Sequence, residues 1–308
     1  MATILITGGT GMIGKALTSA LLEKNYKVII LSRQKIAQQT ETRNLSFAQW
    51  DINNQQIDRT AIGSADFIIH LAGAGVADKR WTKKRKQEIV NSRVKGGELL
   101  VKALQEIPNN VKAVISASGI GWYGADPVIP NPKPFMEDDP ADAAFLGATC
   151  KRWEESIAPI AKMGKRLVKL RTGIVLSNDG GALKEFEWPL RFGVAAILGS
   201  GKQVISWIHI EDLVRIYISA IEDQNISGVY NAVAPGPVSN KKFTFQLARI
   251  NKGQFFIPVY VPSFVLKLVV GEMSIEVLKS ATVSCDKIHY SGFIFLYPST
   301  EAALKSLK

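Results

Sequence analysis

The sequence contains little of what builds disulfide frameworks, metal centres or membrane spans. It has only two cysteines, Cys150 and Cys285, which lie far apart without a C-x-x-C or His-rich spacing. We therefore expect buried thiols and no metal site. No apolar run approaches the roughly 18 residues of a membrane helix. The first strand is expected at the N-terminus itself, with no room before it for a signal peptide. These absences predict a cytoplasmic protein with no membrane partner.

Basic residues outnumber acidic ones, and the net charge is +11. Six cations crowd into residues 79–86 (KRWTKKRK), which we expect to form the exposed start of a helix continuing to Leu104. No nucleic-acid module accompanies this cluster, so no nucleic acid is predicted as a partner. We interpret the cluster as a solvated helix face, or as a positive rim that attracts a phosphorylated ligand.

A glycine-rich turn follows the first predicted strand, Ile4-Leu5-Ile6. Gly9, Gly11 and Gly14 have the G-x-G-x-x-G spacing. In this pattern the first glycine makes a tight turn, the second lets the backbone approach a pyrophosphate, and the third permits close helix-strand packing. A predicted helix, Lys15 to Lys24, would present its N-terminus to the diphosphate. The predicted diphosphate site is formed by Gly8, Gly9, Thr10, Gly11, Met12, Ile13 and Gly14.

The end of the second predicted strand, Val28 to Leu31, indicates which dinucleotide binds. NAD sites usually carry Asp or Glu at this point, whereas a cation suits the 2′-phosphate of NADP. Here Ser32 and Arg33 follow the strand, and no carboxylate occurs between Lys27 and Thr40. A guanidinium can hold a phosphate with two hydrogen bonds. NADP is therefore the predicted cofactor.

Further strands alternate with helical patterns, which predicts an α/β protein with a Rossmann-like, doubly wound parallel sheet. Ligands of such sheets gather at the carboxyl ends of the strands, so we expect the chemistry around Asp51, Ala72, Ser118 and Thr172. The strands are predicted at 45–48, 66–71, 111–116, 166–170 and 229–232.

Pro235-Gly236-Pro237 is a strong chain break that predicts a domain boundary. We expect residues 1–235 to form the dinucleotide-binding domain, with substrate-side excursions near 177–205. Residues 236–308 are expected to form a small C-terminal domain that contains an apolar helix, Ser263 to Ala281. This region either folds over the strand ends to complete a substrate cleft or is a packing appendage.

Ordered motifs along the whole chain resemble the short-chain dehydrogenase/reductase superfamily, extended type, and within it the atypical epimerase-like family. The segments that carry the resemblance include 7–14, 31–33, 70–73, 91–93, 116–124, 150–154, 171–176, 180–183 and 199–213. The resemblance implies an NADP-binding Rossmann domain, a small substrate-side domain, and redox or epimerase chemistry at a carbonyl or hydroxyl carbon. It also implies homodimerisation as a possibility.

The resemblance implies cofactor contacts beyond the glycine turn. By position they fall on Thr10 to Ile13 at the diphosphate, on Ser32 and Arg33 at the 2′-phosphate, and on Leu71 and Ala72 at the ribose. Asp51 would flank the adenine. Further positions that line the cofactor are Glu88, Arg93 and Val175.

The chain departs from the superfamily at the proton-exchanging pair. Extended members use Ser or Thr with a Tyr-x-x-x-Lys pair, whereas this chain has Leu146 and Cys150 where the tyrosine and lysine belong. Ser118 keeps the serine role. The nearest replacement acid is Tyr123, with Arg93 stabilising its phenolate or a substrate oxyanion. A packing or lid role for Tyr123 is the alternative.

Two functions from different classes follow. The first is an NADP-dependent oxidoreductase or epimerase-like enzyme that transfers a hydride to or from a carbon of an unidentified small molecule or nucleotide sugar, with Ser118 and Tyr123 as catalytic candidates. The second is an NADP(H)-binding sensor or interaction protein without turnover. His209 is expected to be structural, at a strand-to-helix junction, and His70 to be a core residue.

Overall fold

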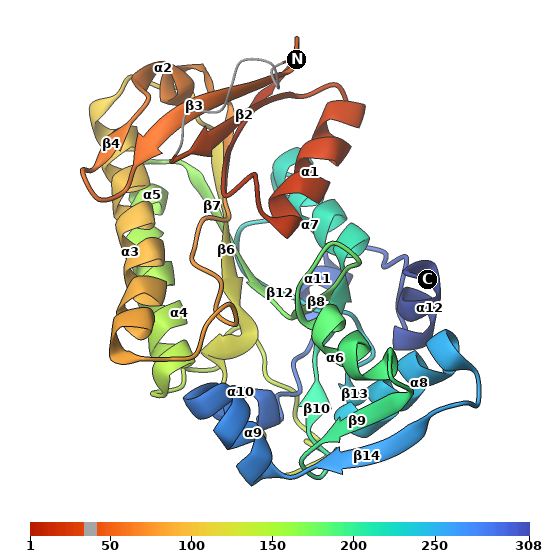
Figure 1. Ribbon diagram of the computed structural model, residues 1–308. Coiled ribbons are helices and arrows are strands. Elements are labelled where there is room, and N and C mark those ends of the chain that lie inside the picture. The colour runs from red at the N-terminus through yellow and green to blue at the C-terminus, as the bar shows by residue number, and fades with distance from the viewer. Residues whose placement is uncertain (34–41) are drawn as a thin grey trace.

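The computed structural model describes residues 1–33 and 42–308, and an eight-stranded sheet forms its centre (Figure 1). The strand order is β12-β7-β6-β5-β1-β2-β3-β4, and every pair is parallel except β3 with β4. The strands are β1 (Thr3–Thr7), β2 (Lys27–Ser32), β3 (Leu45–Asp51), β4 (Gln56–Ile57), β5 (Phe67–His70), β6 (Ala113–Gly119), β7 (Arg166–Thr172) and β12 (Gly228–Ala232). The prediction of a doubly wound parallel sheet is confirmed.

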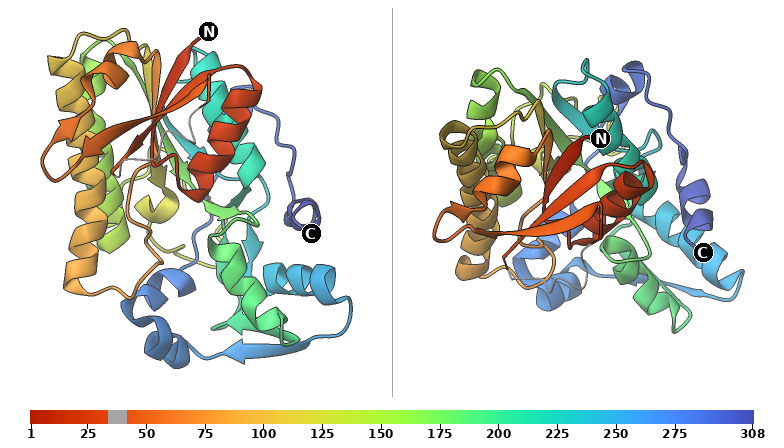
Figure 2. Two further views of the ribbon diagram at one scale, coloured as in Figure 1. Left: turned by 45° about the horizontal axis from the view of Figure 1, so that its top comes forward. Right: turned by 90° about the horizontal axis from the view of Figure 1, so that it is seen from above.

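Helices cover both faces of this sheet, as the view from above shows (Figure 2). On one face lie α1 (Met12–Glu23) and α7 (Ile210–Glu222). On the other lie α2 (Arg59–Ser64), α3 (Lys83–Glu106), α4 (Phe145–Ile157) and α5 (Pro159–Lys162). Parallel strands buried on both faces read as near-continuous apolar runs, which is why the sequence signal for these strands is strong.

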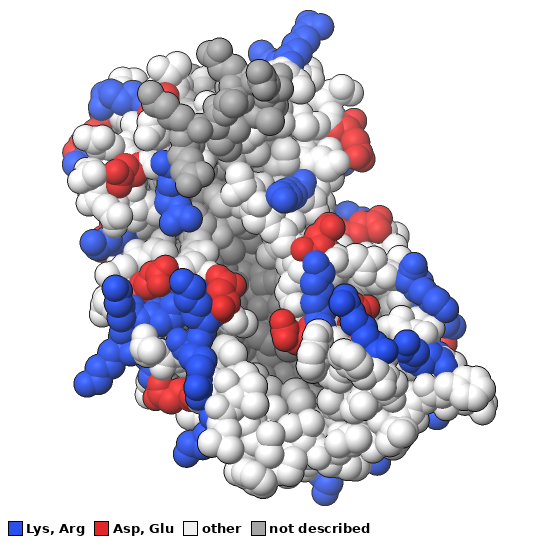
Figure 3. Space-filling view, in the orientation of Figure 1, with Lys and Arg blue, Asp and Glu red and all other residues white. Residues whose placement is uncertain are grey.

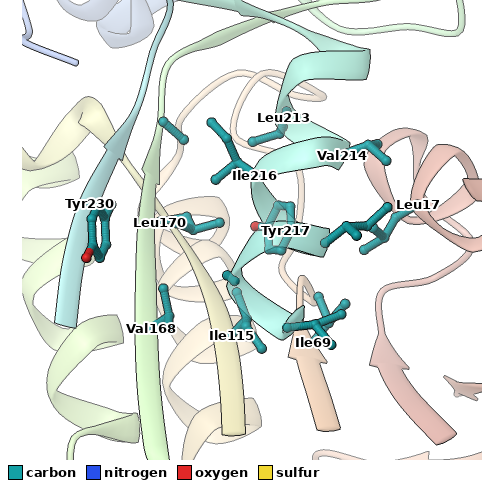
Figure 4. Packing of buried hydrophobic residues seen from close by; sticks show 14 of the residues in the cluster. Leu17, Ile69, Ile115, Val168, Leu170, Leu213, Val214, Ile216, Tyr217 and Tyr230 are labelled. Atoms are coloured by element: carbon teal, nitrogen blue, oxygen red, sulfur yellow. The ribbon is translucent and has the colours of Figure 1, made fainter. Parts of the chain in front are cut away.

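The larger core lies between the sheet and the α1–α7 layer (Figure 4). Leu213, Ile216 and Tyr217 of α7 project onto the sheet, where Ile115 and Leu170 meet them, and all five side chains are fully buried. A second core cluster lies under α3 and α4 on the opposite face. Together the two clusters fix the strand ends from which the site is built.

A smaller part is built on short strands below the carboxyl ends of the sheet (Figure 1). Its paired strands are β8 (Ile174–Leu176) with β11 (Trp207–His209), β9 (Val194–Leu198) with β14 (Ile257–Val261), and β10 (Val204–Ile205) with β13 (Val238–Ser239). Its helices are α6 (Ala182–Leu190), α8 (Asn240–Lys252), α9 (Ser263–Val270), α10 (Ser274–Leu278) and α12 (Thr300–Ser306). The division of the chain at residue 235 stays a prediction.

The last segment of the chain returns to the main sheet. Asp126 accepts hydrogen bonds from the Ser280 hydroxyl at 2.7 Å and from the Thr282 amide and hydroxyl at 2.9 and 2.8 Å. The Phe135 amide donates to the Thr282 carbonyl, and the Ser284 amide donates to the Phe135 carbonyl. These bonds fasten residues 126–135 to the C-terminal segment, and α11 (Asp286–Tyr290) then packs beside β12.

Two predicted helices differ from the structure. The helix predicted over Lys15 to Lys24 begins earlier, at Met12, and ends at Glu23. The single apolar helix predicted over Ser263 to Ala281 is wrong: Gly271 adopts φ +66° and ends α9 after eight residues, and a 3-10 turn and α10 follow. A left-handed glycine is a common helix terminator, and the apolar periodicity on both sides of it concealed the break.

Within residues 1–33 and 42–308, no helix is long and apolar enough to cross a membrane. The same part of the chain contains no cluster of three or more His, Cys, Asp or Glu side chains that could hold a metal ion.

Candidate cofactor site and its neighbouring polar network

The turn between β1 and α1 is closed by backbone contacts that only glycine allows. Gly8 adopts φ +74°, and a Cβ placed there would lie 2.9 Å from the Ala72 amide nitrogen. A Cβ on Gly14 would overlap the Gly8 carbonyl oxygen and would lie 2.5 Å from Gly9 Cα. The structure confirms the close packing expected of Gly14. It corrects the role of Gly9, because Gly8 takes the left-handed conformation, whereas a Cβ on Gly9 would lie 2.9 Å from the Ile30 side chain.

The N-terminus of α1 is open toward the carboxyl edge of the sheet. Gly11 is the N-cap, and no side chain caps the helix there. The first-turn amides of any helix lack intrahelical acceptors. A Cβ on Gly11 would meet only the Gly8 carbonyl oxygen at 3.4 Å, an ordinary contact distance. The turn is therefore closely packed against the protein at Gly8 and Gly14, but nothing obstructs it at Gly11, on the side where a diphosphate would approach. The residues present fit that group.

A second glycine pair lies against this helix terminus. Gly180 and Gly181, between β8 and α6, adopt φ +152° and +75°. A Cβ on Gly181 would lie 3.5 Å from the Met12 sulfur and 3.6 Å from the Val175 carbonyl oxygen. Gly181 thus brings the end of β8, with Val175, close to the first residue of α1.

β2 ends at the half-buried Ser32, and the exposed Arg33 follows it directly. The Arg85 hydrogen bond lowers the pKa of Glu88, and the charges of Lys79 and Arg33 lower it further. Arg33 and Lys79 thus both act on the carboxylate of Glu88, and both cations are exposed to an approaching phosphate. Glu88 itself is exposed and forms a 2.8 Å ion pair with Arg85.

Asp51 ends β3 and holds the following turn. Its Oδ1 accepts from the amides of Asn53 and Asn54 at 2.8 and 3.0 Å, and its Oδ2 accepts from Asn54 Nδ2 at 2.8 Å. The Asn54 amide is the largest cause of a lowered pKa for this carboxyl. Both carboxylate oxygens are thus engaged locally, so any role for Asp51 at an adenine is to shape the turn that lies beside it.

The loop after β5 is tied to β1 through a buried threonine. The amides of Leu71 and Ala72 both donate to Thr7 Oγ1 at 3.2 Å, and the same oxygen lies 2.7 Å from His70 Nδ1. Because Thr7 Oγ1 already accepts twice, its own proton goes to His70 Nδ1 and the imidazole proton is on Nε2. That nitrogen is buried between Trp50 and Trp153 with no hydrogen-bond partner among the described residues. His70 is a core residue, as expected.

We expect His70 to make the protein sensitive to mild acid. Burial, with a smaller contribution from Arg93, lowers the pKa of His70 from 6.5 to about 4. As the pH falls, the histidine of the unfolded chain is therefore protonated before that of the folded protein. The free energy of unfolding decreases between pH 6.5 and pH 4, and from pH 7 to pH 5 it decreases by about 2 kcal/mol. Urea unfolding at the two pH values measures the loss. In His70→Gln the loss must shrink by that amount, and an equal loss in both proteins would contradict the prediction.

Arg93 on α3 points at the loop that follows β5. Its Nη1 donates to the carbonyl oxygens of Ala74 and Ile89 at 2.9 and 3.0 Å, and its guanidinium lies 4.9 Å from the centre of the Trp153 ring. A Cβ on Gly73 would lie 3.0 Å from the guanidinium carbon. Arg93 is therefore positioned beside the predicted ribose site.

The positions of the missing acid-base pair lie on α4, next to the end of β6. The Leu146 side chain would meet a Cβ on Gly121 at 3.1 Å, and Cys150 Sγ is 3.8 Å from the same point. Burial raises the pKa of the Cys150 thiol to about 11, even though Arg93 opposes the shift. At neutral pH the thiol keeps its proton, so Cys150 is a poor nucleophile.

Ser118 belongs to a buried network of charges. Its hydroxyl donates to Glu154 Oε1 at 2.8 Å, and Arg171 Nε donates to the same oxygen at 2.8 Å. Arg171 Nη2 reaches Glu154 Oε2 at 3.2 Å, with Lys169 Nζ at 3.4 Å. Ser118, Glu154 and Arg171 are each at most 5% exposed. Because its proton points to Glu154, the Ser118 oxygen can act only as an acceptor toward the cleft.

Tyr123 enters the same network from the other side. Its phenol donates to Asn231 Oδ1 at 2.7 Å and accepts from Arg171 Nη1 at 3.1 Å, and its ring stacks on Phe135. The expected cation is therefore wrong: Arg171, not Arg93, contacts the phenol. Tyr123 is 0% exposed, and burial raises its pKa to about 12, although Arg171 and Asn231 oppose the shift.

Sequence reasoning missed Glu154 and Arg171 as members of this network. The available signal was Arg171 itself, a charged residue directly after the strand predicted at 166–170; in the structure it pairs in register with Ser118 on β6. Nothing in the sequence indicated that Glu154, one helical turn beyond Cys150, faces Ser118 and Arg171. As expected, His209 is structural: its Nδ1 accepts from the Glu211 amide and caps α7.

The molecule is hollowed on the face that Figure 3 shows. The hollow runs between the basic cluster that begins α3 and the part built around α6 (Figures 1 and 3). It lies at the carboxyl ends of the strands, which is where a doubly wound sheet is expected to bind its ligands.

Comparisons with known proteins show which families and proteins this chain is similar to. Residues 4–149 match the NAD dependent epimerase/dehydratase family, and residues 261–307 match a domain of unknown function, DUF1731. Epimerase family protein SSP1921 of Staphylococcus saprophyticus is 35% identical over 307 residues, which cover 100% of this chain and 99% of that protein. Epimerase family protein YfhF of Bacillus subtilis is 36% identical over 305 residues, which cover 99% and 97% of the two chains.

Among solved structures, that of human epimerase family protein SDR39U1 (isoform2) with NADPH is similar over the full length. The TM-score is 0.85 and the sequence identity 28%, with 99% of this chain and 98% of that chain covered. The similarity thus extends over both the sheet and the smaller part below it.

Proposed function

This chain belongs to the NAD dependent epimerase/dehydratase family, as its sequence resemblance predicted, and from that premise we propose that it is an NADP-dependent oxidoreductase or epimerase-like enzyme. Its substrate would be a small molecule or nucleotide sugar that reacts at a carbonyl or hydroxyl carbon. The observation that carries the proposal is the β1–α1 turn, which is closed to any side chain at Gly8 and Gly14 but open at Gly11.

NADP is proposed over NAD because of Arg33. An exposed guanidinium directly after β2, in a segment (residues 27–40) whose sequence contains no Asp or Glu, suits a 2′-phosphate better than a free ribose hydroxyl. The human relative, whose structure contains NADPH, supports the same choice. The remaining cofactor contacts that we propose are the glycine turn from Gly8 to Gly14, with Ser32, Asp51, Leu71, Ala72, Glu88, Arg93 and Val175.

When bound, the dinucleotide supplies a hydride at nicotinamide C4 to a carbonyl carbon, whose oxygen takes up a proton. Ser118 and Tyr123 remain the proposed catalytic residues on the protein side. Ser118, held by Glu154, can accept a hydrogen bond from a substrate hydroxyl and so orient it. Tyr123 would have to break its bond to Asn231 before its proton could leave.

The burial of Tyr123 favours the second candidate function, an NADP(H)-binding protein without turnover. A phenol with a pKa of about 12 and a thiol with a pKa of about 11 both keep their protons at neutral pH. General acid-base catalysis works best when the pKa of the catalytic group lies near the working pH. In this alternative the chain reports the state of the NADP(H) pool to a partner.

Calorimetric titration with NADPH, NADP⁺, NADH and NAD⁺ tests the cofactor. We expect NADPH to bind at least about tenfold more tightly than NADH, and Arg33→Ala to remove this difference, about 1.4 kcal/mol or more, because the 2′-phosphate loses its cation. Lys27→Ala, an exposed cation at the opposite end of β2, is the matched control and must leave the preference intact. Equal affinities of the wild-type protein for the two dinucleotides would refute the NADP assignment.

Turnover separates the two candidate functions. Aldehydes, ketones and nucleotide sugars are offered to the NADPH-bound protein while the absorbance of the reduced nicotinamide is followed. Oxidation that is lost in Ser118→Ala and Tyr123→Phe supports the enzyme and its proposed residues. Tight NADPH binding without oxidation across the panel supports the protein without turnover.

A further inference from the structure

An apolar surface is exposed on α9 and the short helical turns that follow it. Phe264, Leu268, Val269 and Ile275 are 67%, 71%, 65% and 64% exposed. Side chains this open project into bulk solvent, whereas the wall of a cleft would shield them. The strand that leads into α9 continues the surface, since Ile257 and Val259 of β14 are also exposed. In Figure 3 the lower part of the molecule, where these elements lie, shows few charged side chains.

A cationic cluster adjoins this apolar surface. The cluster is residues 79–86, in which Lys79, Arg80, Lys83 and Lys84 are exposed. Arg80 Nη2 donates to the Leu268 carbonyl oxygen at 3.0 Å and so joins the cluster directly to the end of α9. Lys86 also forms an ion pair with Glu272, in the turn after α9. Charges and exposed apolar side chains from distant parts of the chain thus form one composite surface.

This composition differs from that of an ordinary protein-protein patch. The fully buried centre of a protein interface is depleted in charge, and lysine is disfavoured in it. An anionic lipid surface requires the opposite: aromatic and aliphatic side chains that enter the acyl boundary, with several lysines and arginines at the headgroup level. The protein's net charge of +11 adds a long-range attraction of the same sign.

Although the sequence predicted no membrane partner, we propose that α9 and the cationic cluster together form a docking surface for an anionic lipid bilayer. Phe264, Leu268 and Val269 enter the boundary between headgroups and acyl chains, while Arg80, Lys83 and Lys84 bind lipid phosphates. At eight residues α9 is far too short to span a bilayer, so the contact is with one leaflet only. The docked face lies beside the hollow at the carboxyl ends of the strands.

Co-sedimentation of the full chain with lipid vesicles tests the proposal. Vesicles of phosphatidylglycerol mixed equally with phosphatidylcholine are expected to bind at least about tenfold more protein than pure phosphatidylcholine vesicles, since each cation near the surface contributes roughly 1 kcal/mol. Raising the salt from about 0.05 to 0.5 M must release the protein, because the Debye length then falls well below 10 Å. Equal binding to both vesicle types would overturn the proposal.

Two double variants assign the binding to this surface. Lys83→Glu with Lys84→Glu, and separately Phe264→Ser with Leu268→Ser, are each expected to lower the vesicle partition coefficient at least tenfold. All four side chains are exposed, so thermal unfolding should be little changed. Matched controls lie on α6 and just after it, across the hollow: Lys184→Glu with Arg191→Glu, and Trp188→Ser with Phe192→Ser, whose side chains are also exposed. Controls that lose as much binding as the test variants would overturn the assignment.

The competing occupant is a second copy of this chain. Light scattering across a range of protein concentrations is measured on wild type and on Phe264→Ser with Leu268→Ser. A dimer that this variant abolishes, together with no binding to anionic vesicles, would overturn the lipid proposal in favour of self-association.

Discussion

Gly14→Ala is expected to lower the free energy of unfolding by about 3 kcal/mol or more, at or above the upper end of the cost that is usual for an overpacked site. The added Cβ would lie 2.5 Å from Gly9 Cα and would overlap the Gly8 carbonyl oxygen. Both atoms belong to backbone that is itself fixed by β1 and α1, so no side chain can move aside to relieve the contact. Equilibrium urea unfolding of the two proteins measures the difference.

Gly11→Ala is the matched control, three residues earlier in the same turn. Gly11 has φ −77°, which alanine adopts freely, and its Cβ would meet only the Gly8 carbonyl oxygen at 3.4 Å. The variant should unfold within about 1 kcal/mol of the wild type, since alanine is a poorer N-cap than glycine, but bind NADPH at least about tenfold more weakly, because the new methyl group stands where the diphosphate approaches. If Gly14→Ala were as stable as Gly11→Ala, the packing argument for this turn would be wrong.

Arg171→Met is expected to cost about 3–5 kcal/mol of unfolding free energy, as is usual when one partner of a buried ion pair is removed. Glu154 would lose two of its hydrogen bonds while 4% exposed, and Tyr123 and the Glu137 carbonyl oxygen would each lose a donor. Lys169, at 3.4 Å from Glu154 and 20% exposed, is too loosely placed to compensate.

Chemical denaturation of three variants separates the ion pair from simple loss of packing. Adding Glu154→Gln to Arg171→Met removes the unpaired charge and should recover about 1–3 kcal/mol, since a neutral amide costs less to bury than a carboxylate. Lys169→Met should cost less, about 1 kcal/mol, because its ion pair with Glu154 is long, at 3.4 Å. If the double variant were no more stable than Arg171→Met alone, the unpaired charge of Glu154 would not be the cause of the lost unfolding free energy.

The dinucleotide half of the fold could be predicted because its signals are local. The strand Thr3–Thr7, the glycine turn and the helix after it are contiguous, and their spacing reports backbone requirements directly. Even there the tight turn was assigned to Gly9, the first glycine of the motif, whereas the residue with positive φ is Gly8, where a Cβ would lie 2.9 Å from the Ala72 amide nitrogen.

The polar network could not be predicted, because its members meet only through long-range packing. Ser118, Glu154, Arg171 and Asn231 come from β6, α4, β7 and β12, and no spacing along the chain relates them. The sequence predicted Arg93 as the partner of Tyr123 from homologous position alone. In the structure, α3 carries Arg93 to the loop after β5, and the neighbouring strand supplies Arg171 instead.

The hydrogen bonds between Asp126 and the segment around Ser280 and Thr282 impose an order on biosynthesis. The ribosome delivers the glycine turn and most of the sheet first, and these parts can fold as they emerge. Residues 126–135 then wait, with the buried carboxylate of Asp126 lacking most of its donors, until nearly the whole chain has been translated. Residues 126–135, which pack against Tyr123 through Phe135, therefore take their final position last. A nascent chain can thus form the glycine turn and most of the sheet well before the interior around Tyr123 is closed to solvent.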